Sequence, residues 1–432
     1  MTNPDHEHGG TVPPTIDIDL TSMEVMTCPY ATYEKLREDA PIHRTEAGKY
    51  VVTRYAEVVE VFTDHEHFSR DMVGFFDPER PTRTEIIWHS AEARRIFREE
   101  GWESWPQGAV LFSDPPLHTR YRKFVEPMFS VKRINAMKPE IQSLIDTLID
   151  SFIARGEAEF VSEFAVPLPM KVICRILGFP DEDLEKLKSL SNAMGDAMSY
   201  LQTEEEQINC ARKLVEGQHY FVEQLHRKRR EPADDVLSEL AKVAFGEEDG
   251  FELPEILSLI SSMLIGGNES TTNALSSGLW LMLEKPDVLN ALRSDPSLIR
   301  TFVEETLRLE SPFQFFTRAT RHVCTFAGVR LEPGDLVDVC LGSANRDPRQ
   351  FPDPDRLDLN RKGSATHVAF GAGIHRCLGN VLARFELALA FETLLRRLDN
   401  PRLAERNTFE RMRHPIFRGL KELHITFDPR TM

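Results

Sequence analysis

The stretch Phe370-Gly371-Ala372-Gly373-Ile374-His375-Arg376-Cys377-Leu378-Gly379 decides the fold of this chain. It places one cysteine in a glycine-rich turn, directly before apolar residues at helical spacing. At the N-terminus of a helix, free N–H groups and the helix dipole favour the thiolate form of a cysteine. Gly371, Gly373 and Gly379 carry no side chains, so a flat ligand can approach the sulfur closely.

Two interpretations of this cysteine are open on the loop alone. Ligation of a haem iron by a thiolate needs this arrangement, and electron donation from the thiolate favours cleavage of the O–O bond. A buried free cysteine can equally be a small hydrophobic residue, which is its usual role. The rest of the sequence has to distinguish between them.

The composition predicts a soluble, cytoplasmic protein with a large core. The chain has 432 residues, of which 41% are hydrophobic, and its net charge of −17 argues against nucleic acid as a partner. The first twenty residues are polar and no apolar run reaches the roughly 18 residues of a membrane span, so no signal peptide or membrane anchor is expected. Six scattered cysteines without CxxC pairs argue against disulfides and zinc sites: Cys28, Cys174, Cys210, Cys324, Cys340 and Cys377.

The order of patterns predicts a mainly α fold with a small β portion. We expect a disordered N-terminal tail over residues 1–15 and a single domain over residues 16–432. Short apolar alternations between residues 322 and 341 predict small hairpins. Residues 70–113, rich in Pro, Trp and charge, are expected to pass over a pocket. Apolar periodicity predicts helices over residues 30–38, 56–63, 118–129, 137–155, 158–177, 182–200, 205–229 and 235–245.

The longest helix is predicted from Leu253 to Leu283. Pro254 stands in its first turn, where proline is tolerated, and Pro286 follows its end. Its flanks are apolar, but its centre, Gly266-Gly267-Asn268-Glu269-Ser270-Thr271-Thr272, holds glycines, a carboxylate and hydroxyls. Each mid-helix glycine costs about 1 kcal/mol relative to alanine. Such a break indicates a functional site, and a kinked helix solvated on one side is the alternative.

Glu305 and Arg308 form a third feature. At positions i and i+3 the two charges share one helix face and can pair. On a solvated helix such a pair contributes only about 0.2–0.5 kcal/mol. The pair therefore carries little weight by itself.

Four motifs together make the chain resemble the cytochrome P-450 family of haem-thiolate monooxygenases. The cysteine loop matches the pattern FxxGxHxCxG over residues 370–379, and residues 305–308 match the ExxR pair. Residues 266–272 match the acid–alcohol motif of the long distal helix, and residues 118–122 match HxxxR. The resemblance covers nearly the whole chain after the tail. It implies the cytochrome P-450 fold, a triangular helical prism around a buried haem.

The resemblance also implies how the cofactor, haem b, is held. The cysteine is the implied axial ligand of the iron, glycines and an aromatic residue surround it, and cations bind the propionates. The implied residues are Cys377 for the iron, Phe370, Gly371 and Gly379 in the loop, and His118, Arg122, Arg318 and His375 for the propionates.

In the family, the ExxR pair is locked by an arginine or histidine of the turn-rich segment before the cysteine loop. That segment is residues 343–362 here, and Arg356 is the expected partner of Glu305 and Arg308. The resemblance therefore implies a structural role for the pair rather than a catalytic one.

On the distal helix the family usually has an acid followed by threonine. Alignment through Gly266-Gly267 and Asn273 places Ser270 at the position of that threonine. Ser270 keeps the hydroxyl for proton delivery, but its freer rotamer predicts more uncoupling to peroxide than a threonine would show. Glu269 is expected to relay protons, and Thr271, about 100° further round the helix, is the less favoured donor.

The implied activity is insertion of one oxygen atom from O₂ into an apolar small molecule, typically a hydroxylation. Electrons are expected from a ferredoxin and its NAD(P)H-dependent ferredoxin reductase. Residues 70–113, 194–200 and 311–316 are expected to line the substrate pocket. The cations expected to attract an acidic ferredoxin are Arg120, Lys123, Arg133, Arg376 and Arg384.

Two other functions stay open. A peroxide-driven or isomerising haem-thiolate enzyme would not need the acid and hydroxyl at Glu269 and Ser270. A haem sensor or sequestering protein would have no use for the acid–alcohol helix either. Product formation with ferredoxin and NADH, compared with peroxide alone, distinguishes the first, and absence of any turnover would favour the second.

Overall fold

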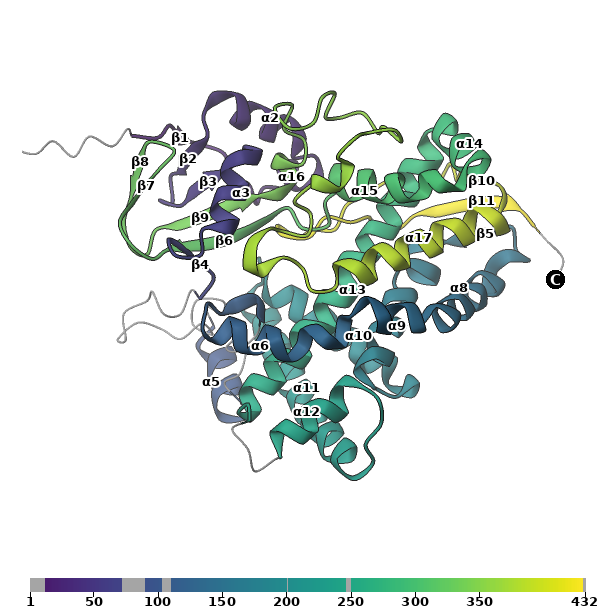
Figure 1. Ribbon diagram of the computed structural model, residues 1–432, viewed down its shortest axis with the longest axis horizontal. Helices are drawn as coiled ribbons and strands as arrows, with labels where there is room; N and C mark the ends of the chain where they lie inside the picture. The colour runs from purple at the N-terminus through teal and green to yellow at the C-terminus, as the bar shows by residue number, and fades with distance from the viewer. Residues whose placement is uncertain (1–11, 72–89, 103–109, 200, 246–249, 430–432) are drawn as a thin grey trace, which may run out of the picture.

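One long helix, α13 (Leu253–Glu284), crosses the middle of the molecule, and other helices pack around it (Figure 1). The computed structural model describes residues 12–71, 90–102, 110–199, 201–245 and 250–429. Glu252 and Glu255 form a capping box at the start of α13, and Pro254 occupies its first turn. The residues on its apolar flanks are buried, as their pattern predicts.

The other helices are amphipathic and bury one side against this centre. In α8, for example, the buried residues Ile141, Ile145, Leu148 and Phe152 recur every three to four positions. In chain order the helices are α1 (Met23–Thr27), α2 (Tyr30–Asp39), α3 (Tyr55–Thr63), α5 (Ala91–Glu99), α6 (Leu117–Val125), α7 (Val131–Ala136), α8 (Lys138–Ile153), α9 (Pro167–Leu177), α10 (Leu184–Ala197), α11 (Glu204–Arg230), α12 (Val236–Ala244), α14 (Pro286–Ser294), α15 (Ile299–Leu309), α16 (Leu341–Ala344) and α17 (Asn380–Arg397).

One predicted helix, over residues 158–177, is divided in the structure. Its first residues belong to the strand β5 (Glu157–Glu159), and a π-helical turn covers Val161–Ala165 before α9 begins at Pro167. Proline has no N–H to donate and is tolerated in the first turn of a helix, so a new helix starts there. Periodicity alone does not register this break.

Three small sheets complete the part of the fold that the structure describes, and the prediction of a mainly α chain with a small β portion is confirmed. The largest sheet has the order β1-β2-β3-β9-β6-β4, and β7 and β8 form one of the hairpins expected between residues 322 and 341. The strands are β1 (Thr15–Ile16), β2 (Ile42–Thr45), β3 (Tyr50–Val52), β4 (Phe68–Ser69), β6 (Phe315–Thr320), β7 (Cys324–Phe326), β8 (Val329–Leu331), β9 (Leu336–Cys340), β10 (Asp399–Leu403) and β11 (His424–Asp428).

The predicted N-terminal tail of residues 1–15 falls mostly on residues 1–11, which lie outside the described residues. Its last residue already belongs to the sheet, because Thr15 pairs with Arg44 and Ile16 is buried. Within the described part of the chain, no helix is long and apolar enough to cross a membrane.

Candidate active site

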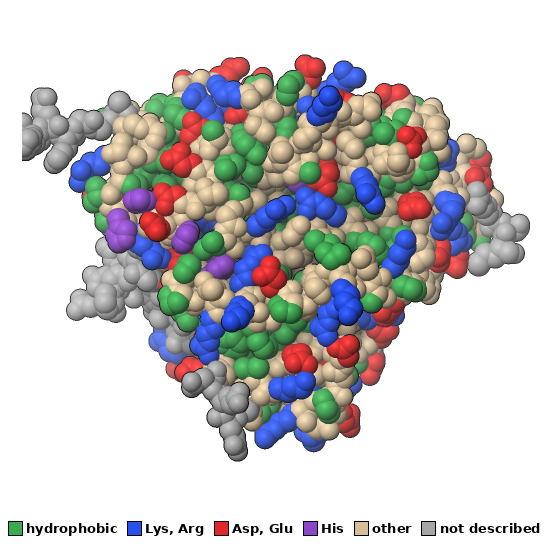
Figure 2. All heavy atoms as spheres, in the orientation of Figure 1, with side chains coloured by type: hydrophobic (Ala, Val, Ile, Leu, Met, Phe, Trp, Pro, Cys, Tyr) green, Lys and Arg blue, Asp and Glu red, His purple; other side chains and the backbone are tan. Residues whose placement is uncertain are grey.

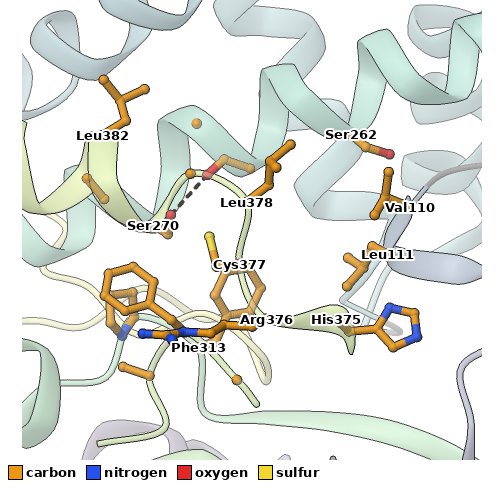
Figure 3. A pocket seen from close by; sticks show the side chains of 18 of the residues that line it. Val110, Leu111, Ser262, Ser270, Phe313, His375, Arg376, Cys377, Leu378 and Leu382 are labelled. Atoms are coloured by element: carbon orange, nitrogen blue, oxygen red, sulfur yellow. Dashed lines mark hydrogen bonds between the residues drawn. The ribbon is translucent and has the colours of Figure 1, made fainter. Parts of the chain in front are cut away.

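A cavity lies between the centre of α13 and the loop that carries Cys377 (Figure 3). It encloses about 1510 Å³ of empty space, counting its mouth. The loop is held by its own backbone, since the N–H of Gly371 donates to Val368 (2.8 Å) and the N–H of Cys377 donates to Phe370 (2.9 Å). The amide of Asn380 at the start of α17 donates to the carbonyl of Cys377 (2.7 Å). The sulfur therefore reaches the cavity from a rigid turn.

The surroundings of Cys377 act on its thiol in opposite directions. Burial raises the pKa of the Cys377 thiol, whereas the N–H of Gly379 and the cations of Arg122, Arg384 and Arg376 lower that pKa. The same donors would stabilise the thiolate once a metal removes the proton. Among the described residues, no group of three or more His, Cys, Asp or Glu could hold a metal ion.

Arg318 and His375 line one side of the cavity, and His118 packs against His375. Nε2 of His118, Nη1 of Arg318 and both ring nitrogens of His375 are buried and make no hydrogen bond to any of the described residues. The two imidazole rings lie 4.5 Å apart between centroids. Burial lowers the pKa of Arg318 to about 10, which leaves it charged at pH 7, and lowers the pKa of His375 to about 4. Two carboxylates, such as those of a haem, fit this set of unsatisfied donors.

Arg122 also borders the cavity, but its guanidinium is engaged by the loop. It donates to the carbonyl of Ile374 (3.0 Å) and to the carbonyl of Arg376 (2.7 Å). Arg122 thereby fastens α6 to the turn before the cysteine. The loop residues that the sequence singled out all line the cavity: Phe370, Gly371 and Gly379.

Asp114 is a residue of this site that sequence reasoning did not assign. Its carboxylate is buried, accepts from the hydroxyl of Ser69 and from Arg321 (2.5 Å), and lies 3.7 Å from Nε2 of His375. These contacts hold the pKa of Asp114 well below its usual range despite burial. The sequence signal was an aspartate beside two prolines, directly before the basic helix α6.

The opposite wall of the cavity is the polar centre of α13. Gly266 and Gly267 line the cavity together with Ser270 and Thr271. The hydroxyl of Ser270 donates to the carbonyl of Gly266 (3.1 Å), one helical turn back. A Cβ at Gly266 would meet nothing within 4 Å, so this turn of the helix stands open to the cavity. Thr271, which helical geometry made the less favoured proton donor, also lines the cavity.

Glu269 does not line the cavity in this structure. Its buried carboxylate accepts from Nζ of Lys188 on α10 (2.5 Å) and from the amide of Asn268 (3.1 Å). Asn268 also donates to the hydroxyl of Ser191 (3.0 Å), so two neighbouring residues of α13 are tied to α10. The acid and the hydroxyls of the predicted motif therefore face different neighbours.

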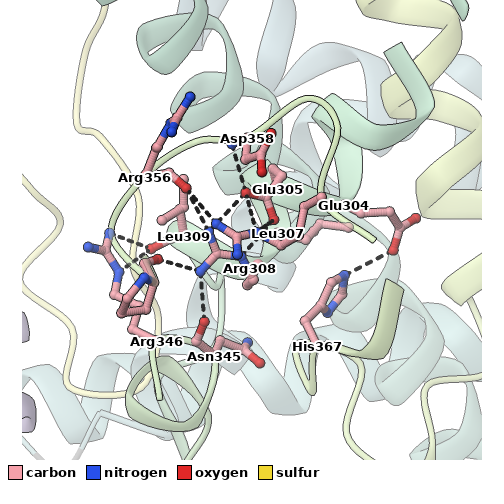
Figure 4. Close-up of polar contacts among 12 residues, drawn as sticks. Glu304, Glu305, Leu307, Arg308, Leu309, Asn345, Arg346, Arg356, Asp358 and His367 are labelled. Carbon is pink, nitrogen blue, oxygen red and sulfur yellow. Dashed lines mark hydrogen bonds and ion pairs between the residues drawn. The ribbon is translucent and has the colours of Figure 1, made fainter. Parts of the chain in front are cut away.

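Glu305 and Arg308 form an ion pair in the interior rather than on a surface (Figure 4). Both side chains are 0% exposed, and Nε of Arg308 lies 2.7 Å from the carboxylate. The carboxylate also accepts from Nε of Arg361 (3.1 Å) and from the backbone N–H of Asp358 (3.0 Å). Every charge in this group has a partner, which is the condition for a stable buried ion pair.

The expected partner of this pair, Arg356, is replaced by Arg361. Arg356 contributes its backbone carbonyl, which accepts from Nη2 of Arg308 (3.1 Å), while the guanidinium that reaches the carboxylate belongs to Arg361. Arg308 further donates to the carbonyls of Asn345 (3.0 Å) and Pro354 (2.5 Å). The turn-rich segment thus directs the side chain of Arg361 toward the ion pair, whereas Arg356 contributes only its backbone carbonyl.

Glu386 on α17 is a second residue that sequence reasoning missed. It lines the cavity, is 1% exposed, and its Oε2 has no hydrogen-bond partner within the described structure. Burial raises the pKa of Glu386 to about 8, so its carboxyl is mostly protonated at pH 7. No motif marked it, because a glutamate within an amphipathic helix ordinarily faces water.

Three of the five cations that were predicted to attract a ferredoxin have partners within this chain. Arg120 donates to the carbonyl of Gly250, Arg133 pairs with Asp234, and Arg384 pairs with Glu304. Lys123 and Arg376 are exposed. Figure 2 shows Lys and Arg side chains across the face formed by α6 and α17, with acidic side chains interspersed.

The substrate side of the cavity has an aromatic wall. Phe313 and Phe316 line it. From the segment of residues 70–113, which was expected to pass over a pocket, Val110 and Leu111 line it too. Residues 72–89 and 103–109 of that segment, which hold most of its aromatic residues, lie outside the described residues, as does Tyr200. Residues 194–199 are not among those that line the cavity.

Comparisons with known proteins agree with this arrangement. The family model for cytochrome P450 matches residues 69–409. The chain is 35% identical over 401 residues to cytochrome P450 107B1 of Saccharopolyspora erythraea, covering 91% of this chain and 93% of that protein. It is 33% identical over 420 residues to the vitamin D(3) 25-hydroxylase of Pseudonocardia autotrophica, with coverage of 96% and 97%. The structure of P450BioI in complex with hexadec-9Z-enoic acid ligated acyl carrier protein is similar with a TM-score of 0.83, 31% identity and coverage of 94% and 100%.

Replacement of Gly373 by alanine should destabilise the cysteine loop. Gly373 has a φ of +66°, and a Cβ there would lie 2.4 Å from the carbonyl oxygen of Phe62. Gly334→Ala is the matched control, because Gly334 has a φ of +91° with nothing within 4 Å. We expect Gly373→Ala to lower the free energy of unfolding by about 1 kcal/mol or more beyond the control, measured by urea denaturation. Equal losses in the two variants would contradict a steric role for Gly373.

Replacement of Glu305 by glutamine should cost far more stability than loss of a surface carboxylate at the same spacing. We expect a loss of about 3–5 kcal/mol in the free energy of unfolding, because Arg308 and Arg361 keep buried charges without a counterion. Glu92→Gln is the control, since Glu92 pairs with Arg95 at i,i+3 on an exposed helix face. The control should lose far less, because solvent screens an exposed ion pair. A Glu305→Gln loss as small as that of the control would show that the buried pair is dispensable.

Proposed function

Because this chain belongs to the cytochrome P450 family of haem-thiolate monooxygenases, we propose that it hydroxylates an apolar organic molecule, using O₂ and electrons from a ferredoxin. The observation that carries this proposal is the position of the Cys377 sulfur in a cavity opposite the hydroxyls of α13. The glycines and hydroxyls of the polar break in α13, otherwise a buried helix, face the same cavity. A sensor would not need these hydroxyls at the cysteine.

Haem b is the cofactor, and bound at this site it supplies the iron at which O₂ is bound and reduced. We assign Cys377 as the residue whose thiolate would hold its iron. The unpartnered nitrogens of His118, Arg318 and His375 would hold the propionates, and Arg122 would keep the loop in place. Gly371 and Gly379 leave room for the flat ring beside the sulfur.

Ser270, Thr271 and Glu269 are assigned to proton delivery. Ser270 and Thr271 present hydroxyls at the cavity wall, and Ser270 can exchange its bond to Gly266 for one to a water molecule in the cavity. Glu269 must first leave Lys188, which holds its carboxylate on the far side of the helix. Rotation about its side-chain bonds would carry protons from the surface toward the hydroxyls.

The substrate is proposed to be apolar, with an extended hydrocarbon part. Phe313, Phe316, Leu111 and Leu259 give the cavity an aromatic and aliphatic wall. Two relatives with similar sequence act on or bind such molecules, according to their names: vitamin D(3), and an acyl carrier protein bearing hexadec-9Z-enoic acid. Hydrophobic burial against this wall would hold the substrate near the iron.

A ferredoxin, reduced by an NAD(P)H-dependent ferredoxin reductase, is the proposed electron donor. The cysteine loop runs into α17 and is bonded to α6 through Arg122, and Lys123 on α6 and Arg376 in the loop are exposed. An acidic carrier would be attracted there, although the chain as a whole is acidic. Because rim charges mainly affect the association rate, the interaction should weaken with added salt.

The carbon monoxide difference spectrum tests the assignment of Cys377. The reduced wild-type protein should give the red-shifted Soret band of a thiolate-ligated haem, and Cys377→Ser should lose that band. The variant should still bind haem, because the propionate cations are unchanged, and haem content by the pyridine haemochrome assay is the control. A wild-type protein without the thiolate band would end the proposal. Turnover by peroxide alone, with none by ferredoxin and NADH, would favour the peroxide-driven alternative.

Replacement of Ser270 by threonine should improve coupling between NADH consumption and product formation. The added methyl group restricts the side-chain rotamer, so we expect about twofold less peroxide released per NADH consumed. Thr271→Ser is the control and should change the peroxide yield less. Peroxide and product are measured together in the reconstituted system with ferredoxin. Unchanged or poorer coupling in Ser270→Thr would mean that the serine controls protons as well as a threonine does.

A further inference from the structure

His414 makes three hydrogen bonds that define its protonation state and connect two distant parts of the chain. Its Nδ1 accepts from the backbone N–H groups of Ile416 (3.1 Å) and Phe417 (3.0 Å). Because Nδ1 must be unprotonated to accept both, the ring proton is on Nε2, which lies 3.0 Å from the carbonyl of Gly195 on α10. The side chain is 7% exposed. The imidazole is thus a neutral bridge from the C-terminal turn to α10.

A row of four rings leads from this bridge to the cavity. The centroids are 4.6 Å apart for His414 and Phe417, 4.7 Å for Phe417 and Phe313, and 4.9 Å for Phe313 and Phe316. Phe313 and Phe316 line the cavity, and Figure 3 shows Phe313 in its wall. Phe417 also lies against α10, since a Cβ at Gly195 would be 3.7 Å from its ring. The four rings therefore form a continuous row of contacts from the cavity to α10.

Backbone hydrogen bonds make the two wall segments move together. The N–H of Gln314 donates to Ile416 (2.8 Å), and the N–H of Arg418 donates to Pro312 (2.9 Å). Phe313 and Phe417 face each other between these bonds as an antiparallel bridge. A shift of the turn that carries His414 would thus displace the Phe313 segment as well.

We propose that His414 is a positioning residue for the substrate wall: its bond to Gly195 fixes Phe417 and Phe313 and so sets the space beside the iron. The inference rests on the proposed function only in that the cavity holds haem and substrate. It names a determinant of ligand fit that lies outside the cavity itself. A wall held in place before the ligand arrives costs less ordering free energy on binding.

The competing explanation is that His414 only closes its own turn. Two substitutions separate the two roles. His414→Asn keeps an oxygen near the position of Nδ1 for the two N–H donors, but its side chain is too short to reach Gly195. His414→Gln keeps a donor near the position of Nε2 for Gly195, but loses the acceptor for the turn. His43→Asn is the control for loss of a buried imidazole, because His43 bonds to Leu36 away from the cavity.

The experiment measures ligand binding to the ferric holoprotein through the shift of the Soret band. Imidazole is the small probe, and 4-phenylimidazole carries a ring that extends toward the wall. In His414→Asn we expect the dissociation constant of 4-phenylimidazole, relative to that of imidazole, to rise about threefold or more. The ratio should stay at the wild-type value in His414→Gln and in His43→Asn.

An unchanged ratio in His414→Asn would overturn the proposal, and so would a changed ratio in His414→Gln. If His414→Asn does not fold, His414→Gln still tests the proposal, because a changed ratio in a variant that keeps the bond to α10 would overturn it. The carbon monoxide spectrum of each variant is recorded first. An intact thiolate band with an unchanged ratio in His414→Asn refutes the role of His414 alone, whereas a missing band in the wild-type protein refutes the proposed function.

Discussion

The buried ion pair between Glu305 and Arg308 is the interaction on which the cysteine loop depends. Two charges without exposure are stable only if every hydrogen-bonding group has a partner, and here the turn-rich segment supplies those partners. Arg308 binds the carbonyl of Asn345, whose side-chain oxygen accepts from the N–H of Val368 (2.7 Å). Val368 begins the turn that ends at Cys377. The position of the sulfur is thus set by a network that starts on α15, beyond the cavity.

The electrostatics of the site oppose those of the chain as a whole. The protein carries a net charge of −17, yet the described side chains with unpartnered nitrogens at the cavity are cations and imidazoles. Arg318 is 2% exposed, and its desolvation lowers its pKa. Such groups destabilise a protein unless a ligand satisfies them. Binding of a dianionic haem would offset this cost, so the same residues that weaken the empty fold would hold the cofactor.

Local patterns predicted the scaffold well and the side-chain partners less well. The long helix was expected from Leu253 to Leu283 and ends one residue later, because apolar periodicity and proline are local signals. Arg361, rather than Arg356, reaches the ion pair, since an irregular segment has no period from which a direction can be derived. The direction of Glu269 depends on Lys188, 81 positions away, and no motif contains that contact.

The sequence by itself determined the class of the fold, the family resemblance and which residue types surround the cysteine. These follow from spacing along the chain, and spacing is a property of neighbouring residues. Only the tertiary structure decided which groups meet: Asp114 beside His375, Glu386 at the cavity, and His414 on the carbonyl of Gly195. Each of these contacts joins segments far apart in the chain, and burial and hydrogen bonding between such segments depend on how the helices pack. The loop around Cys377 could therefore be identified from the sequence. The aromatic wall of the cavity and the pairing of charges around it could be identified only from the folded structure.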